Sequence, residues 1–200
     1  MNTTHTTPRN ALLWQEFIVG GQKSGKTRRA EQAACDWLNA QPHHQAVYLA
    51  TGQAWDAEMT QRIARHQADR AQRVPGMRTV EAPLQLAQAL KAHSDAHTLV
   101  VVDCLTLWLT NWTMPASAPA DDDEQQALQR WQAQRALFLE TLSQCAGPVV
   151  VVSNEIGQGV IPLGREVRTF VDALGSLNQD VARVCSHAIW MVAGLPVQLK

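Results

Sequence analysis

The segment that most constrains this chain lies at residues 20–27. It reads Gly-Gly-Gln-Lys-Ser-Gly-Lys-Thr and matches the phosphate-binding pattern G-x-x-x-x-G-K-[ST]. An apolar, strand-like run at residues 17–19 precedes it, and residues 28–39 have the apolar face of an amphipathic helix. A strand that enters a glycine-rich turn and then a helix surrounds a phosphate with backbone N–H groups. The pattern and its two flanks together predict a P-loop that binds a nucleoside triphosphate.

Two side chains of this loop have predicted roles. Lys26 is expected to reach the outer phosphates, and the Thr27 hydroxyl is expected to bind Mg²⁺. The alternative is a glycine turn that happens to contain a lysine. Such a turn would have no reason to lie between a strand and a helix, so the phosphate-binding interpretation is the better one.

The composition is that of one globular domain. The chain is 46% hydrophobic and 18% charged, with a formal net charge of −1. Residues 14–200 are long enough to bury a substantial core, so we expect a single domain there. The near-neutral charge gives no electrostatic reason to expect nucleic acid as a partner. The apolar runs are of strand length, so membrane insertion is not expected either.

The beginning of the chain and the cysteines bear on location. Residues 1–13 are polar and threonine-rich, lack the apolar region of a secretory signal, and are predicted to be a disordered tail. Cys35, Cys104, Cys145 and Cys185 are widely spaced, with no C-x-x-C pair. Buried, reduced thiols are therefore a better interpretation than a disulfide or a metal site. The sequence predicts a cytoplasmic protein.

Apolar runs alternate with helical patterns along the chain. Strands are predicted at residues 17–19, 47–50, 78–80, 99–102, 149–152 and 188–192. Helices are predicted at residues 28–39, 56–70, 83–93, 105–112 and 125–144, and in two pieces within 165–185. This alternation is typical of an α/β fold with a mostly parallel sheet flanked by helices. Residues 194–196 look like a turn into a short antiparallel edge strand at 197–199.

Polar residues follow two of the predicted strands. Asp103 closes the run at 99–102, where a carboxylate could hold the metal of a bound nucleotide. An aspartate that caps the following helix is the competing interpretation. Asn154 and Glu155 follow the run at 149–152 and reach the same edge of the sheet, although an ordinary turn explains them equally well. The acidic, proline-containing stretch at 114–124 is interpreted as a solvated loop rather than a metal site.

The predicted helix at residues 56–70 carries a histidine between two arginines. Glu58, Arg62, His66 and Arg70 follow one another at i, i+4 spacing, and the apolar residues of the helix are expected on another face. A neutral imidazole is a nucleophile, and arginines can neutralise a phosphate brought up to it. An exposed helix with ordinary Glu–Arg pairing fits the same pattern. The spacing alone leaves both interpretations open.

Several segments together resemble one family. They are the P-loop, the block R-I-x-x-H-x-x-x-R at residues 62–70, V-V-D-C-L-T-L-W-L-T-N from residue 101, and N-E-x-G-x-G-x-x-P at 154–162. The chain resembles the bifunctional adenosylcobinamide kinase/adenosylcobinamide-phosphate guanylyltransferases of cobalamin biosynthesis, from about residue 17 to residue 200. The two later blocks are far more specific than the P-loop, which many families share.

The resemblance implies a P-loop NTPase architecture of the recombinase-like kind and a two-step activity. ATP or GTP would phosphorylate adenosylcobinamide with the help of Mg²⁺. GTP would then transfer GMP to adenosylcobinamide phosphate through a covalent guanylyl-histidine, and the matching histidine is His66. Lys26 would share in catalysis by absorbing the charge of the leaving phosphates. The resemblance also implies a homo-oligomer, namely a trimer.

The resemblance also implies a set of nucleotide and metal contacts. Thr27 and Asp103 match the metal side of the site. The implied nucleotide contacts are Gly21, Gln22, Lys23, Ser24, Gly25, Lys26, Thr27, Arg28, Ala50, Thr51, Gly52, Gln67, Ala68, Asp69, Arg70, Glu81 and Asp103.

Two other functions compete with this one. Another small-molecule P-loop kinase would use the helix at 56–70 only as a phosphate clamp, without a covalent intermediate. An NTP-binding module of recombinase type would act on nucleic acid, but the charge balance and the lack of a basic stripe oppose it.

Overall fold

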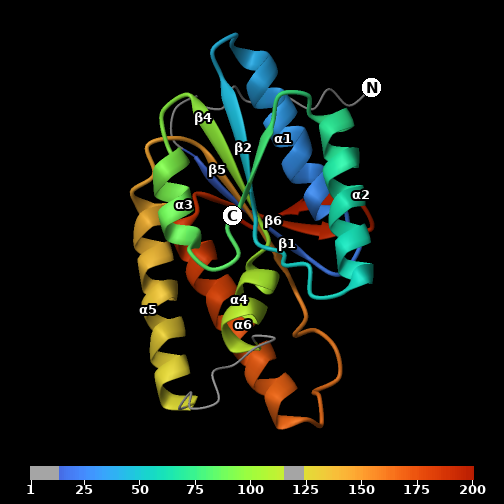
Figure 1. Cartoon of the computed structure of the whole chain (residues 1–200), viewed down its shortest axis with the longest axis vertical. Coiled ribbons are helices and arrows are strands. Elements are labelled where there is room, and N and C mark those ends of the chain that lie inside the picture. The colour runs from blue at the N-terminus through green and yellow to red at the C-terminus, as the bar shows by residue number, and fades with distance from the viewer. Residues whose placement is uncertain (1–13, 115–123) are drawn as a thin grey trace.

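The computed structural model describes residues 14–114 and 124–200 (Figure 1). The predicted tail at 1–13 and residues 115–123 of the acidic loop lie outside the described part. The strands are β1 (Gln15–Gly20), β2 (Gln45–Ala50), β3 (Arg78–Glu81), β4 (Thr98–Asp103), β5 (Val149–Asn154), β6 (His187–Val192) and β7 (Leu195–Gln198). The helices are α1 (Lys26–Ala40), α2 (Ala57–Arg73), α3 (Leu86–His93), α4 (Leu105–Thr113), α5 (Glu124–Ser143) and α6 (Arg165–Val184).

The strands form one sheet in the order β3-β2-β4-β5-β1-β6-β7. Every pairing is parallel except that of β6 with β7, so the predicted α/β class and the antiparallel C-terminal edge strand are confirmed. Because β1 lies between β5 and β6, the loop after β1 opens near the middle of the carboxyl edge. The ends of β2 and β4 reach that same edge, since Ala50 pairs with Asp103.

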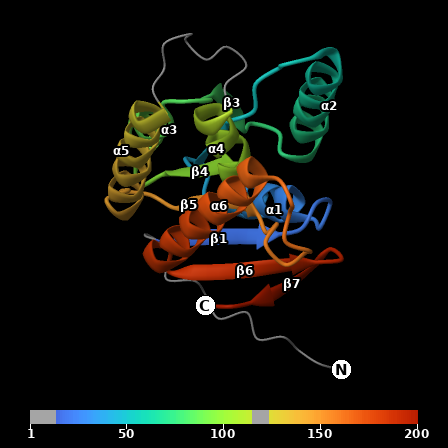
Figure 2. The same ribbon diagram turned by 90° about the horizontal axis from the view of Figure 1, so that it is seen from below.

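Helices cover both faces of the sheet. The strands β4 and β5 are apolar almost throughout, as expected for parallel strands that are buried on both sides. Alternate residues point to opposite layers, so that Phe17 and Val19 join α3, α4, α5 and α6, whereas Ile18 joins α1. The helix α2 lies at the periphery, away from β1 and β6 (Figure 2). Only Arg70 of its residues is buried.

Two predicted helix boundaries are wrong, each for a physical reason. The helix predicted from Pro83 begins only at Leu86. The residues before it stay outside the helix because the Ala82 N–H continues the strand ladder to Ala50 and the Pro83 carbonyl accepts a bond from the Asn111 amide. The two predicted pieces after residue 165 are one helix, α6, although Gly175 lies within it.

Packing explains why α6 is continuous. A glycine inside a helix costs about 1 kcal/mol relative to alanine. The buried stripe Leu174, Leu177, Asn178 and Val181 runs past Gly175 at helical spacing and packs on the sheet, which offsets that cost.

Two further expectations concern the cysteines and the membrane. All four cysteines are free thiols; Cys104, Cys145 and Cys185 are buried as predicted, whereas Cys35 is only partly buried. None of the helices in the described ranges combines the length and the apolar character that crossing a bilayer requires.

Candidate active site

The turn after β1 can be made only by a chain with glycine at two positions. A Cβ on Gly20 would lie 2.5 Å from the Met191 carbonyl oxygen and 2.7 Å from the Ser24 hydroxyl. Gly25, directly before α1, has a φ of 99°, in the left-handed region that favours glycine. The predicted strand–turn–helix context of the P-loop is therefore present, and the glycines have steric reasons for being there.

The start of α1 is suited to an anion. Its first turn contains no acidic residue and its N-cap makes no side-chain hydrogen bond, so the first N–H groups of the helix are available to an anion. The Ser24 hydroxyl is buried and has no hydrogen-bond partner among the described residues. A buried donor without a partner is costly, and a phosphate oxygen would satisfy it. The loop at residues 20–27 thus fits the triphosphate that the sequence predicts.

Lys26 is held inside this loop. Its side chain is buried, and the ammonium group donates a hydrogen bond to the Gly21 carbonyl at 2.7 Å. Burial lowers the pKa of Lys26, while the nearby Asp103 carboxylate opposes that shift. A bound triphosphate would add negative charge beside this buried cation and would favour its protonated form. The Lys26 ammonium is therefore in a position to stabilise negative charge that develops on a phosphate in this turn.

Thr27 and Asp103 meet at the carboxyl edge of the sheet. The Thr27 hydroxyl donates to Asp103 Oδ2 at 2.8 Å. The capping interpretation of Asp103 is wrong, because Cys104 is the N-cap residue of α4 and no side chain caps that helix. A hydroxyl and a carboxylate oxygen at this separation are the hard donors that Mg²⁺ prefers. The pair fits the predicted metal side of the site.

Tyr48 is a residue that the sequence analysis missed. Its phenol donates to the same Asp103 oxygen at 2.8 Å. Burial, followed by the charge of Asp103, raises the pKa of Tyr48 well above its usual value, so the phenol remains a donor. The signal for it was available, since Tyr48 is the one tyrosine of the chain and lies in an otherwise apolar buried strand.

Arg70 is less available to phosphate than the sequence suggests. Its guanidinium lies 3.6 Å from the centre of the Tyr48 ring, and it donates to the Thr79 hydroxyl at 3.0 Å. The side chain is 4% exposed. A chain of contacts thus runs from α2 through Arg70 and Tyr48 to Asp103. Arg70 therefore supports the Tyr48 ring, and through it Asp103, rather than facing the phosphate-binding turn.

Some of the predicted nucleotide contacts after β2 are already occupied by bonds within the protein. The Thr51 hydroxyl is fully buried, donates to the Cys104 carbonyl at 2.7 Å and accepts from the Cys104 N–H at 2.8 Å. Gly52 lies beside α2, since a Cβ there would be 3.9 Å from the Ile63 side chain. Ala50 and Glu81 end paired strands at this edge, and Glu81 is exposed. Of these residues, Gly52 and Glu81 remain open to a ligand.

The predicted faces of α2 need correction. His66 and Arg70 do not lie apart from the apolar residues, because Met59, Ile63, His66 and Arg70 form the inward side of the helix. Residues seven apart point in more nearly the same direction around a helix than residues four apart, since 3.6 residues complete a turn. Glu58 and Arg62, which the i, i+4 series includes, are exposed.

His66 is half-buried on that inward side. Within the described residues its ring has no hydrogen-bond or ion-pair partner. The exposed-helix interpretation therefore does not hold for His66 itself, whereas it describes Arg62 well. A half-buried imidazole without a partner among the described residues is free to act as a nucleophile on a ligand that reaches it.

The remaining predicted nucleotide contacts lie on α1 and α2, outside the P-loop turn. Gln67 and Ala68 are exposed on α2, and Asp69 is paired with Arg73 at 3.1 Å. Arg28 is exposed on α1 beside the C-terminal end of α2. The structure does not bring these side chains into the P-loop.

A pocket lies between the P-loop and the residues that end or follow β5 and β6. It has a volume of about 360 Å³, and residues 21–24, Glu155, Gln158 and residues 190–193 line it. Asn154 anchors this edge, because it donates twice to the Thr106 hydroxyl and accepts from the Asn178 amide. Glu155 accepts a hydrogen bond from the Gly157 N–H at 2.7 Å. The block at 154–162 is thus part of the site's wall rather than a remote turn.

Comparison with known proteins shows the family to which the chain is similar. Residues 16–199 match the family described as "Cobinamide kinase / cobinamide phosphate guanyltransferase". The chain is 42% identical over 186 residues to the "Bifunctional adenosylcobalamin biosynthesis protein CobP" of Pseudomonas aeruginosa, covering 93% of this chain and 97% of that protein. It is 32% identical to the protein CobU of Escherichia coli, covering 92% of this chain and 98% of the relative. The CobU of Salmonella typhimurium is 30% identical, with the same two coverages.

Proposed function

This chain belongs to the cobinamide kinase / cobinamide phosphate guanyltransferase family, and we propose that it carries out both reactions at the P-loop edge of its sheet. It is a bifunctional enzyme of adenosylcobalamin biosynthesis. In the first reaction a nucleoside triphosphate, ATP or GTP, phosphorylates adenosylcobinamide. In the second, GMP passes from GTP to adenosylcobinamide phosphate, and adenosylcobinamide-GDP and pyrophosphate are formed.

The observation that carries the kinase half is the convergence of three groups on one turn. Three groups belong to the turn at residues 20–27. They are the buried Lys26 ammonium, the Ser24 hydroxyl, which has no partner among the described residues, and the N-terminus of α1. Phosphoryl transfer requires mainly positioning and charge stabilisation, and these groups supply both. Thr27 and Asp103 would hold Mg²⁺, which would neutralise charge on the phosphates when bound.

The guanylyl half rests on His66. The imidazole attacks the α-phosphorus of GTP, a nitrogen–phosphorus bond forms, and the bond to pyrophosphate breaks. A phosphate oxygen of adenosylcobinamide phosphate then displaces the histidine nitrogen. A covalent intermediate of this kind divides one transfer into two in-line displacements. The half-buried position of His66, on the side of α2 that also carries the buried Arg70, supports this role.

The test of the function is a stepwise product assay with the purified chain. With adenosylcobinamide, Mg²⁺ and ATP, we expect a product that is heavier by one phosphate. Addition of GTP should then give adenosylcobinamide-GDP together with one pyrophosphate per product, as followed by mass spectrometry and a coupled phosphate assay. Formation of the phosphate without any GDP product would instead support a kinase that has no guanylyl transfer.

We propose further that the enzyme is a homo-oligomer, a trimer by family resemblance. An exposed apolar group on the loop before α6 supports an interface, because Val160 is 96%, Ile161 78% and Leu163 97% exposed. Apolar side chains that stand this far out of a surface usually mark a contact with another protein. The near-neutral net charge argues against nucleic acid as that partner, and the four free thiols suit the cytoplasm.

Replacement of Leu163 with glutamate is expected to shift the protein from trimer to monomer in size-exclusion chromatography with light scattering. A charge on this loop cannot be buried without a partner, so the interface would be lost. Leu128→Glu on α5 is the matched control, because Leu128 is also exposed but lies elsewhere, and it should leave the trimer intact. A wild-type chain that is monomeric at micromolar concentration would contradict the oligomer.

A further inference from the structure

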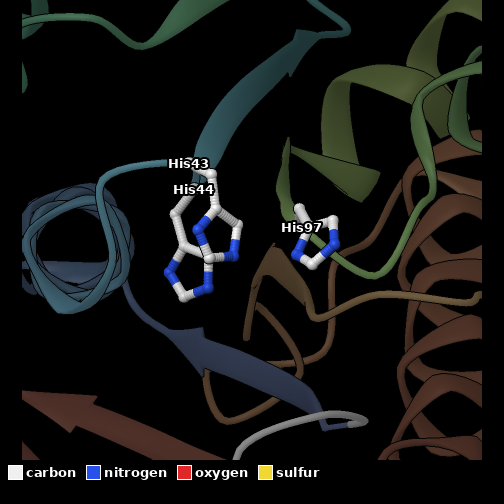
Figure 3. Close-up of side chains that lie close together, drawn as sticks. All are labelled: His43, His44 and His97. Atoms are coloured by element: carbon white, nitrogen blue, oxygen red, sulfur yellow. The ribbon is translucent and has the colours of Figure 1, made fainter.

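Three histidines gather at the opposite edge of the sheet from the P-loop. His43 and His44 directly precede β2, and His97 directly precedes β4 (Figure 3). Their potential ligand nitrogens all lie within 4.8 Å of one another. The P-loop follows the carboxyl end of β1, whereas these residues come before the amino ends of parallel strands, so the cluster plays no part in the nucleotide site.

The strand register brings the cluster together. Gln45 and Thr98 are partners in the parallel pair of β2 and β4, so the residues just before them are neighbours. The Gln45 N–H donates to the His97 carbonyl at 2.9 Å. Trp37 on α1 fastens both segments, since its indole N–H donates to the Gln45 carbonyl at 3.1 Å and to the His97 carbonyl at 3.3 Å. The backbone beneath the histidines is therefore fixed in position.

His44 has a defined tautomer. Its Nδ1 lies 2.7 Å from the Trp37 carbonyl oxygen, which can only accept, so Nδ1 must carry the proton. The other ring nitrogen, Nε2, is then bare in the neutral ring. A histidine that donates one N–H to a backbone carbonyl and presents its other nitrogen is the arrangement that metal-binding histidines commonly have. The ring is also stacked on Trp37 at 3.6 Å with an interplanar angle of 1°, which fixes its direction.

His43 and His97 complete the group from the solvent side. Their rings meet edge to face with centroids 4.6 Å apart, and both residues are exposed. The neighbouring carboxylate, Asp95, accepts hydrogen bonds from the His97 N–H at 2.7 Å and from the Thr98 hydroxyl at 2.6 Å. Asp95 is thus engaged in the loop, and three imidazoles remain as the available ligands.

We propose that His43, His44 and His97 form a binding site for a divalent transition metal of the zinc type, with water in the fourth position. Three imidazoles are a recurrent ligand set for Zn²⁺. Tetrahedral coordination at Zn–N of about 2.0–2.1 Å places the nitrogens about 3.3 Å apart. The present spread of 4.8 Å must therefore shorten, and rotation of the exposed His43 and His97 side chains toward the fixed His44 achieves this.

Such a metal would tie two connections of the fold together. One leads from α1 into β2 and the other from α3 into β4, and both lie far from residues 20–27 along the strands. Because the ion would bind the folded chain and not the separated segments, it would stabilise the fold without entering the reaction. Packing of the three rings without a metal is the competing explanation of the cluster.

Isothermal titration of the untagged full chain with Zn²⁺ tests the proposal. We expect one ion per chain in a site that His43→Ala and His97→Ala each weaken by about tenfold or more, since even loss of a group that supports a ligand has an effect of that size. The control is His187→Ala, which removes an exposed histidine outside the cluster and should bind like the wild type.

A second measurement separates binding from misfolding. Zn²⁺ should raise the Tm of the wild type and of His187→Ala, and should leave the Tm of the double variant His43→Ala/His97→Ala unchanged. Circular dichroism of the metal-free variants should match that of the wild type. Equal Zn²⁺ affinity in the wild type and the double variant, or no binding to the wild type, would overturn the proposal.

Discussion

The His66→Ala variant is expected to lose the covalent label that α-labelled GTP leaves on the wild-type protein. It should still transfer the γ-phosphoryl group to adenosylcobinamide. The ring of His66 has no partner among the described residues, so its removal breaks no hydrogen bond and leaves the P-loop unchanged. Only the reaction that needs a nucleophile on the protein should fail.

The size of the effect should be large. Deletion of an enzyme's nucleophile commonly lowers the rate by factors of about 10⁴ to 10⁶, so we expect GMP transfer to fall by at least about 10³-fold. A nitrogen–phosphorus bond is broken by acid more readily than a phosphate ester. The label on the wild type should therefore disappear in acid and survive in base.

Gln61→Ala is the matched control for this variant, because Gln61 is an exposed residue of the same helix and lies outside the predicted nucleotide contacts. It should keep both the label and the product. A label that persists in His66→Ala would mean that another residue is the nucleophile. A wild type that forms the phosphate product without any adduct would favour the simple kinase that the sequence left as an alternative.

The order of strands and helices could be predicted from the sequence because the hydrophobic pattern is local. Buried parallel strands such as β4 and β5 have continuous apolar runs, and the runs at residues 99–102 and 149–152 therefore predict them correctly. The errors occurred where tertiary contacts decide. The start of α3 depends on a bond between Asn111 and the Pro83 carbonyl, and these residues are 28 positions apart.

The site could be predicted where a local sequence motif contains the functional residues. It could not be predicted where the pairing register of two strands brings distant residues together. The P-loop residues and Asp103 follow from local pattern and strand position. The contact of Tyr48 with Asp103 joins residues 55 positions apart and requires the pairing of β2 with β4. The same pairing assembles the three-histidine cluster, which no spacing in the sequence indicates. The inward direction of His66 was missed because i, i+4 spacing drifts around a helix.

The Lys26→Ala variant is expected to lose both reactions together. The buried ammonium is held inside the phosphate-binding turn by its hydrogen bond to the Gly21 carbonyl before any ligand arrives. Loss of one preorganised group of this kind typically costs about 10²–10³ in rate. We expect at least that loss in phosphoryl transfer, as measured with saturating ATP or GTP.

The variant should fold normally. Burial lowers the pKa of Lys26, so keeping this side chain charged is already unfavourable in the free protein, and alanine removes that strain. Lys91→Ala is the control, because Lys91 is an exposed lysine of α3, outside the phosphate-binding turn, and should keep the activity. Lys26→Arg retains the charge but not the compact shape, so it should restore little.

The guanylyl label in Lys26→Ala distinguishes one nucleotide site from two. If pyrophosphate leaves from the same turn that holds the kinase nucleotide, labelling of His66 should fall in parallel with phosphoryl transfer. The contacts that run from α2 through Arg70 and Tyr48 to Asp103 favour this single site, since they connect the histidine's helix to the P-loop. Full labelling in a variant that has lost its kinase activity would contradict it, and would place the GTP that guanylylates His66 in a separate pocket.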